Sequence, residues 1–277
     1  MSAAGAEPVR EPPDRNWAHY ELWDRVRKTI DDVPLHFRST ITITGIRATE
    51  IYTFGEALGT TIEQEILRTL NDLHNHWDDQ NGTYAQYEFV RQPQNFPDVL
   101  LRNTSTGQIV MGIELKSWYL LAKEGEPSFR FKVTPAACEK GDLLVLVPWT
   151  LSNVMSGAPM ILKPYVELAR YMAIYRNHWW QNLRKAEGDA TIRSPPNARP
   201  YPSTRDEIAD DPVEDKGNNF GRIARMGLMD AYVRSFDSLE LLGIELRYWR
   251  DFFKTGGRMH NFGKQTTLPT VTASSKP

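Results

Sequence analysis

The sequence contains a single cysteine, Cys138, among its 277 residues. One cysteine cannot form an intrachain disulfide, and it also excludes zinc sites built from four cysteines or from a CxxC pair. A chain without disulfides is typical of a reducing compartment. We therefore expect a cytoplasmic protein.

Long apolar runs are missing too. The longest, residues 143–151, is far shorter than the roughly 20 residues that span a bilayer. The N-terminal stretch MSAAGAEPVREPPDR contains no apolar run of the kind that signal peptides carry. We expect a soluble protein with no membrane partner.

Neither sign of charge is in excess, because the sequence has 33 Lys and Arg and 35 Asp and Glu, for a net charge of −2. Proteins that bind nucleic acid through a broad basic surface are usually positive. Composition alone therefore indicates no DNA partner, although a locally basic cleft is compatible with it. The 40% of hydrophobic residues is enough for a sizeable core.

Several motifs are absent as well. The sequence has no GxxxxGK[ST] motif, which argues against an ATP-driven enzyme, and its six histidines form no HExxH pattern. His74 and His76 lie together near the end of one predicted helix, but without partners they are weak zinc candidates.

Composition predicts one domain between two tails. Residues 1–15 are rich in Pro, Ala and charge, and residues 264–277 are rich in Thr and Ser, so we expect both to be flexible. Residues 16–263 have the length of one large domain. Within it, residues 188–218 are polar and contain several prolines, which predicts a long connection.

Hydrophobic periodicity predicts an α/β (α+β) fold. Helical spacing or composition marks residues 17–32, 55–74, 134–140, 164–186 and 220–236. Strand patterns mark residues 87–90, 97–102, 108–118 and 142–149, and residues 239–254 look mostly strand or mixed. This order predicts a central mixed β-sheet flanked by helices, with a mostly helical C-terminal extension.

The two strands around the turn-forming sequence NTSTG predict a β-hairpin. A three-residue loop over residues 105–107, ending in a left-handed glycine, would pair Thr104 with Gln108. That register places Asp98 directly opposite Glu114, with Cβ atoms roughly 4.5–5.5 Å apart. Two carboxylates this close repel each other, so a cation between them is expected. Oxygen ligands favour Mg²⁺.

Strand alternation places Lys116 on the same face as Glu114, while Leu115 points to the other face. Taken alone, a Pro-Asp pair usually begins a turn, and alternating Glu and Lys usually form a solvated face. The strongly apolar strand around Glu114, and its pairing with the strand that follows Asp98, favour a buried functional site instead.

Pro97-Asp98 followed by Glu114-Leu115-Lys116 resembles the signature of the PD-(D/E)XK nuclease superfamily, which includes most type II restriction endonucleases. The resemblance covers about residues 55–150 and implies a restriction-endonuclease-like αβββαβ core. It also implies that Asp98 and Glu114 hold Mg²⁺, that the Leu115 carbonyl adds a ligand, and that Lys116 lies beside the attacking water.

Many members of this superfamily carry a further glutamate on the preceding helix. Glu63 fits this position best, and Glu56 and Glu65 are its competitors. A plain surface position for Glu63 is an equally good interpretation of the sequence.

DNA recognition is expected in the C-terminal part, at about residues 188–263. Residues 215–225 (DKGNNFGRIAR) lead from a loop into the predicted helix. Asn pairs with adenine and Arg with guanine in the major groove, although an Asn here could instead cap the helix. The expected DNA contacts are Asn218, Asn219, Arg222 and Arg225, with Lys132 preferred among the other basic residues Lys123, Arg130, Lys140 and Arg193.

The leading hypothesis is a Mg²⁺-dependent type II restriction endonuclease that cuts double-stranded DNA at a short site, with a companion DNA methyltransferase. Symmetric cutting of two antiparallel strands favours a homodimer. A DNA repair or structure-specific nuclease of the same superfamily is the alternative. A non-catalytic DNA-binding module is a third reading, against which the intact Asp98, Glu114 and Lys116 argue.

Overall fold

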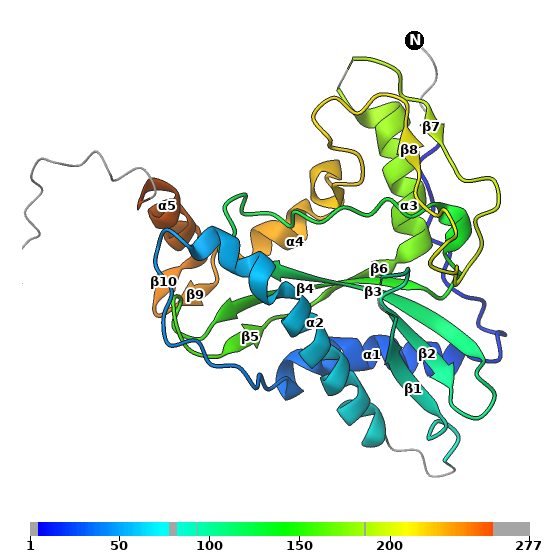
Figure 1. Cartoon of the computed structure of the whole chain (residues 1–277), viewed down its shortest axis with the longest axis horizontal. Coiled ribbons are helices and arrows are strands. Elements are labelled where there is room, and N and C mark those ends of the chain that lie inside the picture. The colour runs from blue at the N-terminus through cyan, green and yellow to red at the C-terminus, as the bar shows by residue number, and fades with distance from the viewer. Residues whose placement is uncertain (1–4, 78–81, 93, 186, 257–277) are drawn as a thin grey trace, which may run out of the picture.

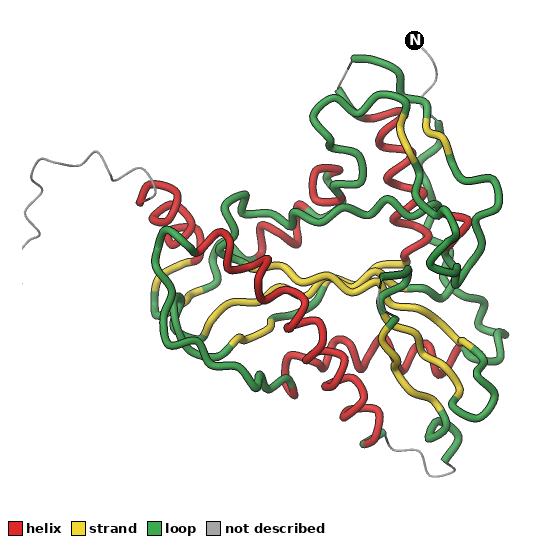
Figure 2. Tube along the Cα trace, viewed as in Figure 1, coloured by secondary structure: helices red, strands yellow, loops and turns green. Residues whose placement is uncertain are grey.

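A six-stranded mixed sheet forms the centre of the protein in the computed structural model (Figure 1). Helices α1 (Tyr20–His36) and α2 (Ile51–Asn75) cover one face, and the C-terminal half of the chain, from α3 (Ala169–His178) on, lies on the other (Figure 2). The predicted α/β class with a central mixed sheet is therefore confirmed. The structure describes residues 5–77, 82–92, 94–185 and 187–256.

The sheet combines an antiparallel meander with one parallel pair. Its path runs through β1 (Tyr87–Arg91), β2 (Val99–Asn103), β3 (Ile109–Tyr119), β4 (Leu143–Leu151) and β5 (Pro159–Ile161), and β6 (Tyr165–Leu168) also pairs with β4. β2 is antiparallel to both β1 and β3, whereas β4 runs parallel to β3. Every residue of β4 is buried, as expected for a strand covered on both faces.

The two N-terminal helices pack through their predicted apolar stripes. On α2, Ile62, Ile66 and Leu70 are at most 2% exposed, because their spacing puts them on one side of the helix. Ile66 and Leu70 meet Ile113 and Leu115 of β3 beneath the sheet. This packing fixes the position of α2 against β3.

Two predicted helices in the middle of the chain are partly wrong. Residues 134–140 contain only the 3₁₀ turn η1 (Pro135–Ala137). Residues 164–186 begin with β6 instead of a helix, continue as α3 and end in the π-helical turn η2 (Trp179–Leu183). The residues of β6 pair with Leu143–Leu146 of β4, and this long-range pairing outweighs their local helical pattern.

The C-terminal extension is less helical than predicted. The helix expected at residues 220–236 is split into the 3₁₀ turn η3 (Ile223–Met226) and α4 (Asp230–Ser235), because Gly227, with a φ of 81°, ends the first piece in a left-handed conformation. The remaining elements are β7 (Ile192–Arg193), β8 (Asp211–Pro212), β9 (Glu240–Leu241), β10 (Ile244–Glu245) and α5 (Leu246–Gly256). Residues 239–254 are thus mixed, with two short strands followed by a helix.

The expected N-terminal tail is described from residue 5 onward, and residues 5–15 contain no helix or strand. Arg10 nevertheless contacts the folded core, since its Nε lies 2.8 Å from Glu167 Oε2 and its guanidinium lies 4.5 Å from the Tyr171 ring centre. The predicted tail at 264–277 lies outside the described residues. Among the residues that are described, no helix combines the length and apolar character that crossing a membrane requires.

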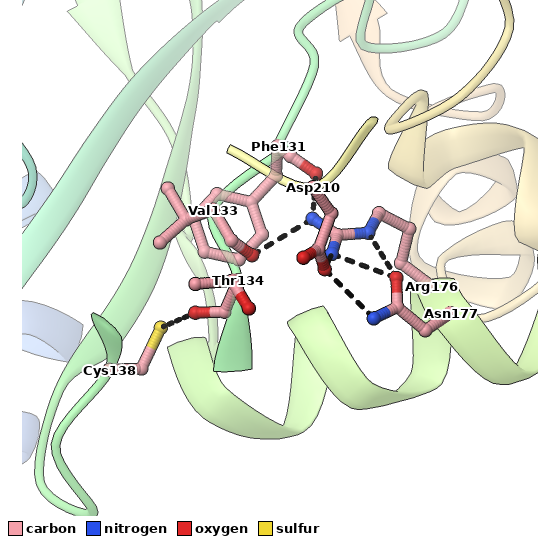
Figure 3. Close-up of polar contacts among 7 residues, drawn as sticks. All are labelled: Phe131, Val133, Thr134, Cys138, Arg176, Asn177 and Asp210. Atoms are coloured by element: carbon pink, nitrogen blue, oxygen red, sulfur yellow. Dashed lines mark hydrogen bonds and ion pairs between the residues drawn. The ribbon is translucent and has the colours of Figure 1, made fainter. Parts of the chain in front are cut away.

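A buried arginine fastens the extended segment 130–133 to α3 (Figure 3). Arg176 is 1% exposed, and its Nη1 donates to the carbonyls of Phe131 at 2.8 Å and Val133 at 2.9 Å. Its Nη2 forms an ion pair with Asp210. Burial lowers the pKa of Arg176 to about 10, against the raising effect of Asp210, so the guanidinium stays charged at neutral pH.

Candidate functional site

The hairpin of β2 and β3 brings Asp98 and Glu114 together. Val99 faces Ile113 and Leu100 faces Gly112 in this antiparallel pair. Continuing the register by one residue puts Asp98 opposite Glu114, as predicted from the turn.

The turn reaches this register by a different route. The loop has four residues, since Asn103 N donates to Gln108 O at 2.8 Å across it, and Gly107 adopts the expected left-handed φ of 73°. One extra residue, Val110, forms a bulge in β3 between its pairings with Leu101 and Arg102. The longer loop and the bulge shift the register in opposite directions, so their effects cancel at the site.

Beyond the start of β2, β3 presents a free edge that two carboxylates occupy. Asp98 Oδ2 accepts a hydrogen bond from Leu115 N at 3.0 Å, and Glu63 Oε1 accepts one from Ser117 N at 3.1 Å. The N–H and C=O of one strand residue point to the same side. The Leu115 carbonyl therefore points to the edge between the two carboxylates.

Lys116 joins the carboxylates on the face of the strand. Its Nζ lies 2.9 Å from Asp98 Oδ2 and 2.8 Å from Glu114 Oε1. Glu114 is 8% exposed, whereas the side chains of Lys116 and Asp98 are 23% and 35% exposed. The cluster is therefore buried at Glu114 and open at Asp98.

The four groups influence one another electrostatically. Burial raises the pKa of Glu114 to about 7, with Lys116 opposing the rise and Asp98 adding to it. Burial lowers the pKa of Lys116, but Glu114 and Asp98 outweigh it and raise the pKa overall. Burial also raises the pKa of Glu63, which Lys116 lowers and Asp98 raises. Lys116 is thus held in its charged form.

Of the three glutamates weighed on α2, Glu63 is the one that adjoins the cluster. Glu65 points elsewhere and accepts hydrogen bonds from Ser39 Oγ at 2.8 Å, Thr40 N at 2.7 Å and Thr40 Oγ1 at 2.6 Å. Its function is to hold the loop that follows α1. Glu56 is exposed and lies about two turns before Glu63 on α2.

The oxygen donors at this edge suit Mg²⁺. No three side chains of His, Cys, Asp or Glu come close enough to hold a metal ion within the described part of the chain. The available donors are the carboxylates of Asp98 and Glu114 with the Leu115 carbonyl. Mg²⁺ commonly uses one or two carboxylates and keeps several waters, so this set fits the ion chemically.

Close packing of Pro97 against Gly112 positions Asp98. Sequence analysis did not identify Gly112. A Cβ atom at Gly112 would lie 2.1 Å from Pro97 Cγ and 3.1 Å from Asp142 Oδ1. Asp142 is fully buried and accepts a hydrogen bond from Gly112 N at 2.6 Å. Gly112 could have indicated this packing from the sequence, because a glycine inside a strand often marks a close approach of other groups to the backbone.

The segment expected to read DNA is built around Asp215. Its carboxylate accepts hydrogen bonds from Asn219 N at 2.7 Å and from Phe220 N at 3.1 Å. Asn218 is exposed and left-handed, with a φ of 54°, and Asn219 Oδ1 accepts from Arg225. The alternative interpretation, in which one of the asparagines caps a helix, is wrong, because Arg222 precedes η3, Met229 precedes α4, and neither element has a side-chain cap.

The predicted arginines lie against an acidic loop. Arg222 Nη1 is 3.4 Å from Glu124 Oε2, and Arg225 Nε is 3.2 Å from Glu126 Oε1. Lys132 lies beside Gly221, where it has no ion-pair partner among the described residues. The structure thus brings Arg222, Arg225 and Lys132 into one region.

A groove of about 700 Å³ connects this region with the carboxylate cluster. Its lining includes Glu63 and Ser117 beside the cluster, and also Arg130 and Arg222. Sequence analysis did not identify the lining residues on α2 and β3, which include Tyr52, Gly55, Gly59, Trp118 and Tyr119.

Two glycines on α2 allow the close approach that shapes this part of the lining. A Cβ at Gly55 would lie 2.9 Å from Tyr119 Cβ, and one at Gly59 would lie 3.0 Å from Ser117 Oγ. Their four-residue spacing puts both on one side of the helix, and this spacing could have indicated such an approach from the sequence.

The sequence matches no protein-family model, and no curated protein matches it.

Proposed function

We propose that the protein is a Mg²⁺-dependent endonuclease that hydrolyses phosphodiester bonds in double-stranded DNA at a short specific site, in the manner of type II restriction enzymes. The observation that carries the proposal is the position of Lys116 Nζ, 2.9 Å from Asp98 and 2.8 Å from Glu114. Two carboxylates and an ammonium group at one strand edge supply what metal-assisted phosphodiester hydrolysis requires.

The order of elements supports the same proposal. α2 is followed by the antiparallel strands β1, β2 and β3 and by β4, which is parallel to β3. This order agrees with the restriction-endonuclease-like αβββαβ core that the resemblance implies. It departs from that core between β3 and β4, where a 3₁₀ turn replaces a helix.

Each residue has a distinct role in the proposal. Asp98, Glu114 and the Leu115 carbonyl would hold Mg²⁺, which when bound would offset charge on the phosphate oxygens and lower the pKa of a water molecule. Lys116 would hold the attacking water or a phosphate oxygen in line, because its compact ammonium is partly exposed. Glu63 would orient that water by accepting a hydrogen bond.

The restriction role implies two partners, a second copy of this chain and a DNA methyltransferase. Cutting both strands of a symmetric site requires two equivalent active sites, which a homodimer supplies. A companion DNA methyltransferase would protect the same sites in the host DNA. A DNA repair nuclease would use the same residues but would prefer ends, flaps or mismatches to an intact duplex.

Plasmid cleavage tests the proposal. The wild-type protein is incubated with plasmid DNA in Mg²⁺ or in EDTA, beside Lys116→Ala. Lys28→Ala is the matched control, because Lys28 lies on α1, on the opposite face of the sheet, with its side chain 75% exposed.

Discrete fragments are expected from the wild type and from Lys28→Ala in Mg²⁺ only. Lys116→Ala should be slower by on the order of 10²-fold or more. Equal activity of Lys116→Ala, or no cleavage of any DNA by the wild type, would contradict the proposal. Cleavage confined to flaps, ends or mismatches would support the repair alternative.

A further inference from the structure

Two arginines that line the groove are neighbours across an antiparallel bridge. Arg130 and Arg222 are directly paired in an antiparallel bridge, and Phe131 N donates to Gly221 O at 2.8 Å beside it. Residues paired in this way point to the same side, with Cβ atoms roughly 4.5–5.5 Å apart. The bridge therefore places the two arginine side chains next to each other where they leave the backbone.

The charge of this pair is only partly balanced. Glu124 lies 3.4 Å from Arg222, and the Nε–H of Arg222 is buried without an acceptor in the described part of the chain. Arg130 is exposed, and no described carboxylate forms an ion pair with it. Like charges that face each other across a ladder destabilise it, so an anion between the two side chains would be favourable.

Lys132 extends the same charged face. Side chains alternate along an extended segment, and Phe131 and Val133 are buried, so Arg130 and Lys132 both point away from the core. A Cβ at Gly221 would lie 3.1 Å from Lys132 Cγ, which shows that the lysine stem crosses the backbone next to Arg222. Three cationic side chains thus share one surface.

This surface is rigid before any ligand arrives. The guanidinium of Arg176 holds the carbonyls of Phe131 and Val133 (Figure 3). Lys132 O accepts a hydrogen bond from Asp210 N at 2.8 Å. A backbone that is already held in place adds no ordering cost of its own when its side chains bind a ligand. Arg225 is held by Glu126 and Asn219 and is therefore engaged within the protein.

We propose that Arg130 and Arg222, extended by Lys132, form a clamp for a backbone phosphate of a DNA strand bound in the groove. The DNA as ligand rests on the proposed function, since the groove leads to Glu63 and Ser117 beside the cluster. Guanidinium groups match phosphate geometry in a bidentate fashion. Contacts of this kind position DNA without reading its sequence, so Arg222 serves as a backbone contact and not as a base reader.

Binding is measured in EDTA, where cleavage does not interfere, with fluorescein-labelled duplexes of two unrelated sequences over a series of NaCl concentrations. Arg130→Ala and Arg222→Ala are compared with Arg27→Ala. Arg27 is an exposed arginine on α1, a helix that contributes no residue to the lining of the groove. Arg222→Lys retains the charge and guards against a simple folding defect, and thermal melting checks that each variant is folded.

Each alanine variant of the clamp should weaken binding of both duplexes by about tenfold. Each should also reduce the slope of log K against log[salt] by about 0.9, the amount expected for one lost phosphate contact. Arg222→Lys should keep the slope, and Arg27→Ala should change neither the affinity nor the slope.

The clamp would be overturned if Arg130→Ala and Arg222→Ala behaved like Arg27→Ala, or if the loss of affinity occurred with one duplex sequence only. Plasmid cleavage separates this result from the nuclease proposal. Cleavage by the wild type together with unchanged binding by Arg130→Ala would reject the clamp alone. The expected salt slopes without any cleavage would support the clamp and reject the nuclease.

Discussion

A single oxygen atom, Asp98 Oδ2, accepts hydrogen bonds from Lys116 Nζ at 2.9 Å and from the backbone N–H of Leu115 at 3.0 Å. Asp98 lies just before β2, and Lys116 lies on β3. The pair therefore ties the end of one strand to the free edge of the next. Any change at Asp98 alters both the charge of the cluster and the way in which this edge is closed.

Asp98→Asn should abolish the stabilisation of the fold by divalent metal. A metal that binds only the folded wild type raises its unfolding free energy by about 2.7 kcal/mol when the free ion is at a hundred times its Kd. Removing one of two carboxylate donors should remove most of that gain. Thermal unfolding with MgCl₂, CaCl₂ or EDTA measures it, and an equal metal-dependent shift in both proteins would argue against Asp98 as a ligand.

Glu63→Gln and Glu65→Gln should separate activity from stability, although the two residues lie two positions apart on α2. Glu63→Gln keeps the hydrogen bond with Ser117 N and removes a charge beside Lys116, so cleavage should fall by about 10- to 100-fold with little change in melting temperature. Glu65→Gln should retain activity and lose about 1–3 kcal/mol of stability, because it weakens bonds to Ser39 and Thr40. The opposite pattern would exchange their roles.

The contribution of Glu65 to stability should depend on pH. Burial raises its pKa, but hydrogen bonds from Thr40 and Ser39 outweigh burial and hold the pKa below the ordinary value. A carboxyl group with a lowered pKa in the folded state stabilises the protein above its unfolded pKa, and this stabilisation is lost as the pH falls through the folded pKa. Urea unfolding should show the difference between wild type and Glu65→Gln shrinking below about pH 4. A difference that grows in acid would contradict this assignment.

Gly112→Ala should reduce activity by displacing Asp98, although Gly112 itself is not a proposed metal ligand or catalytic residue. The new methyl group would meet Pro97 Cγ at 2.1 Å and force the residue that precedes Asp98 to move. Cleavage should fall well below that of the wild type, and overpacking should cost about 1–3 kcal/mol. Gly107→Ala in the hairpin turn is the control. Its φ of 73° makes alanine costly by about 1–2 kcal/mol, but nothing within 4 Å would be displaced. If both variants retained full activity, the packing of Pro97 on Gly112 would not position Asp98.

Arg176→Met should be the most destabilising of these changes. It leaves Asp210, which is 1% exposed, without its cation and frees the carbonyls of Phe131 and Val133. Breaking a buried ion pair by removing one partner costs about 3–5 kcal/mol. The double variant Arg176→Met/Asp210→Leu should recover part of this loss in denaturant unfolding, since no charge is then left buried. A double variant no more stable than Arg176→Met would show that the carbonyl bonds dominate.

Local spacing in the sequence determined a large part of this protein. The apolar stripes of α1 and α2, the strands of the meander and the alternation that puts Glu114 and Lys116 on one face all follow from short-range periodicity. The position of Asp98 opposite Glu114 was also predictable, although it depends on two deviations that cancel, a longer loop and the bulge at Val110.

Contacts between distant segments decided the rest, because they depend on which surfaces the folded chain brings together. The pairing of β6 with β4 replaced a predicted helix, and the packing of α2 on β3 brought Glu63 to the cluster while Glu65 took the loop after α1. The bridge between Arg130 and Arg222 joins residues that are far apart in the chain. No local pattern encodes such a meeting, since each arginine alone looks like a solvated charge, and only the tertiary structure makes them neighbours.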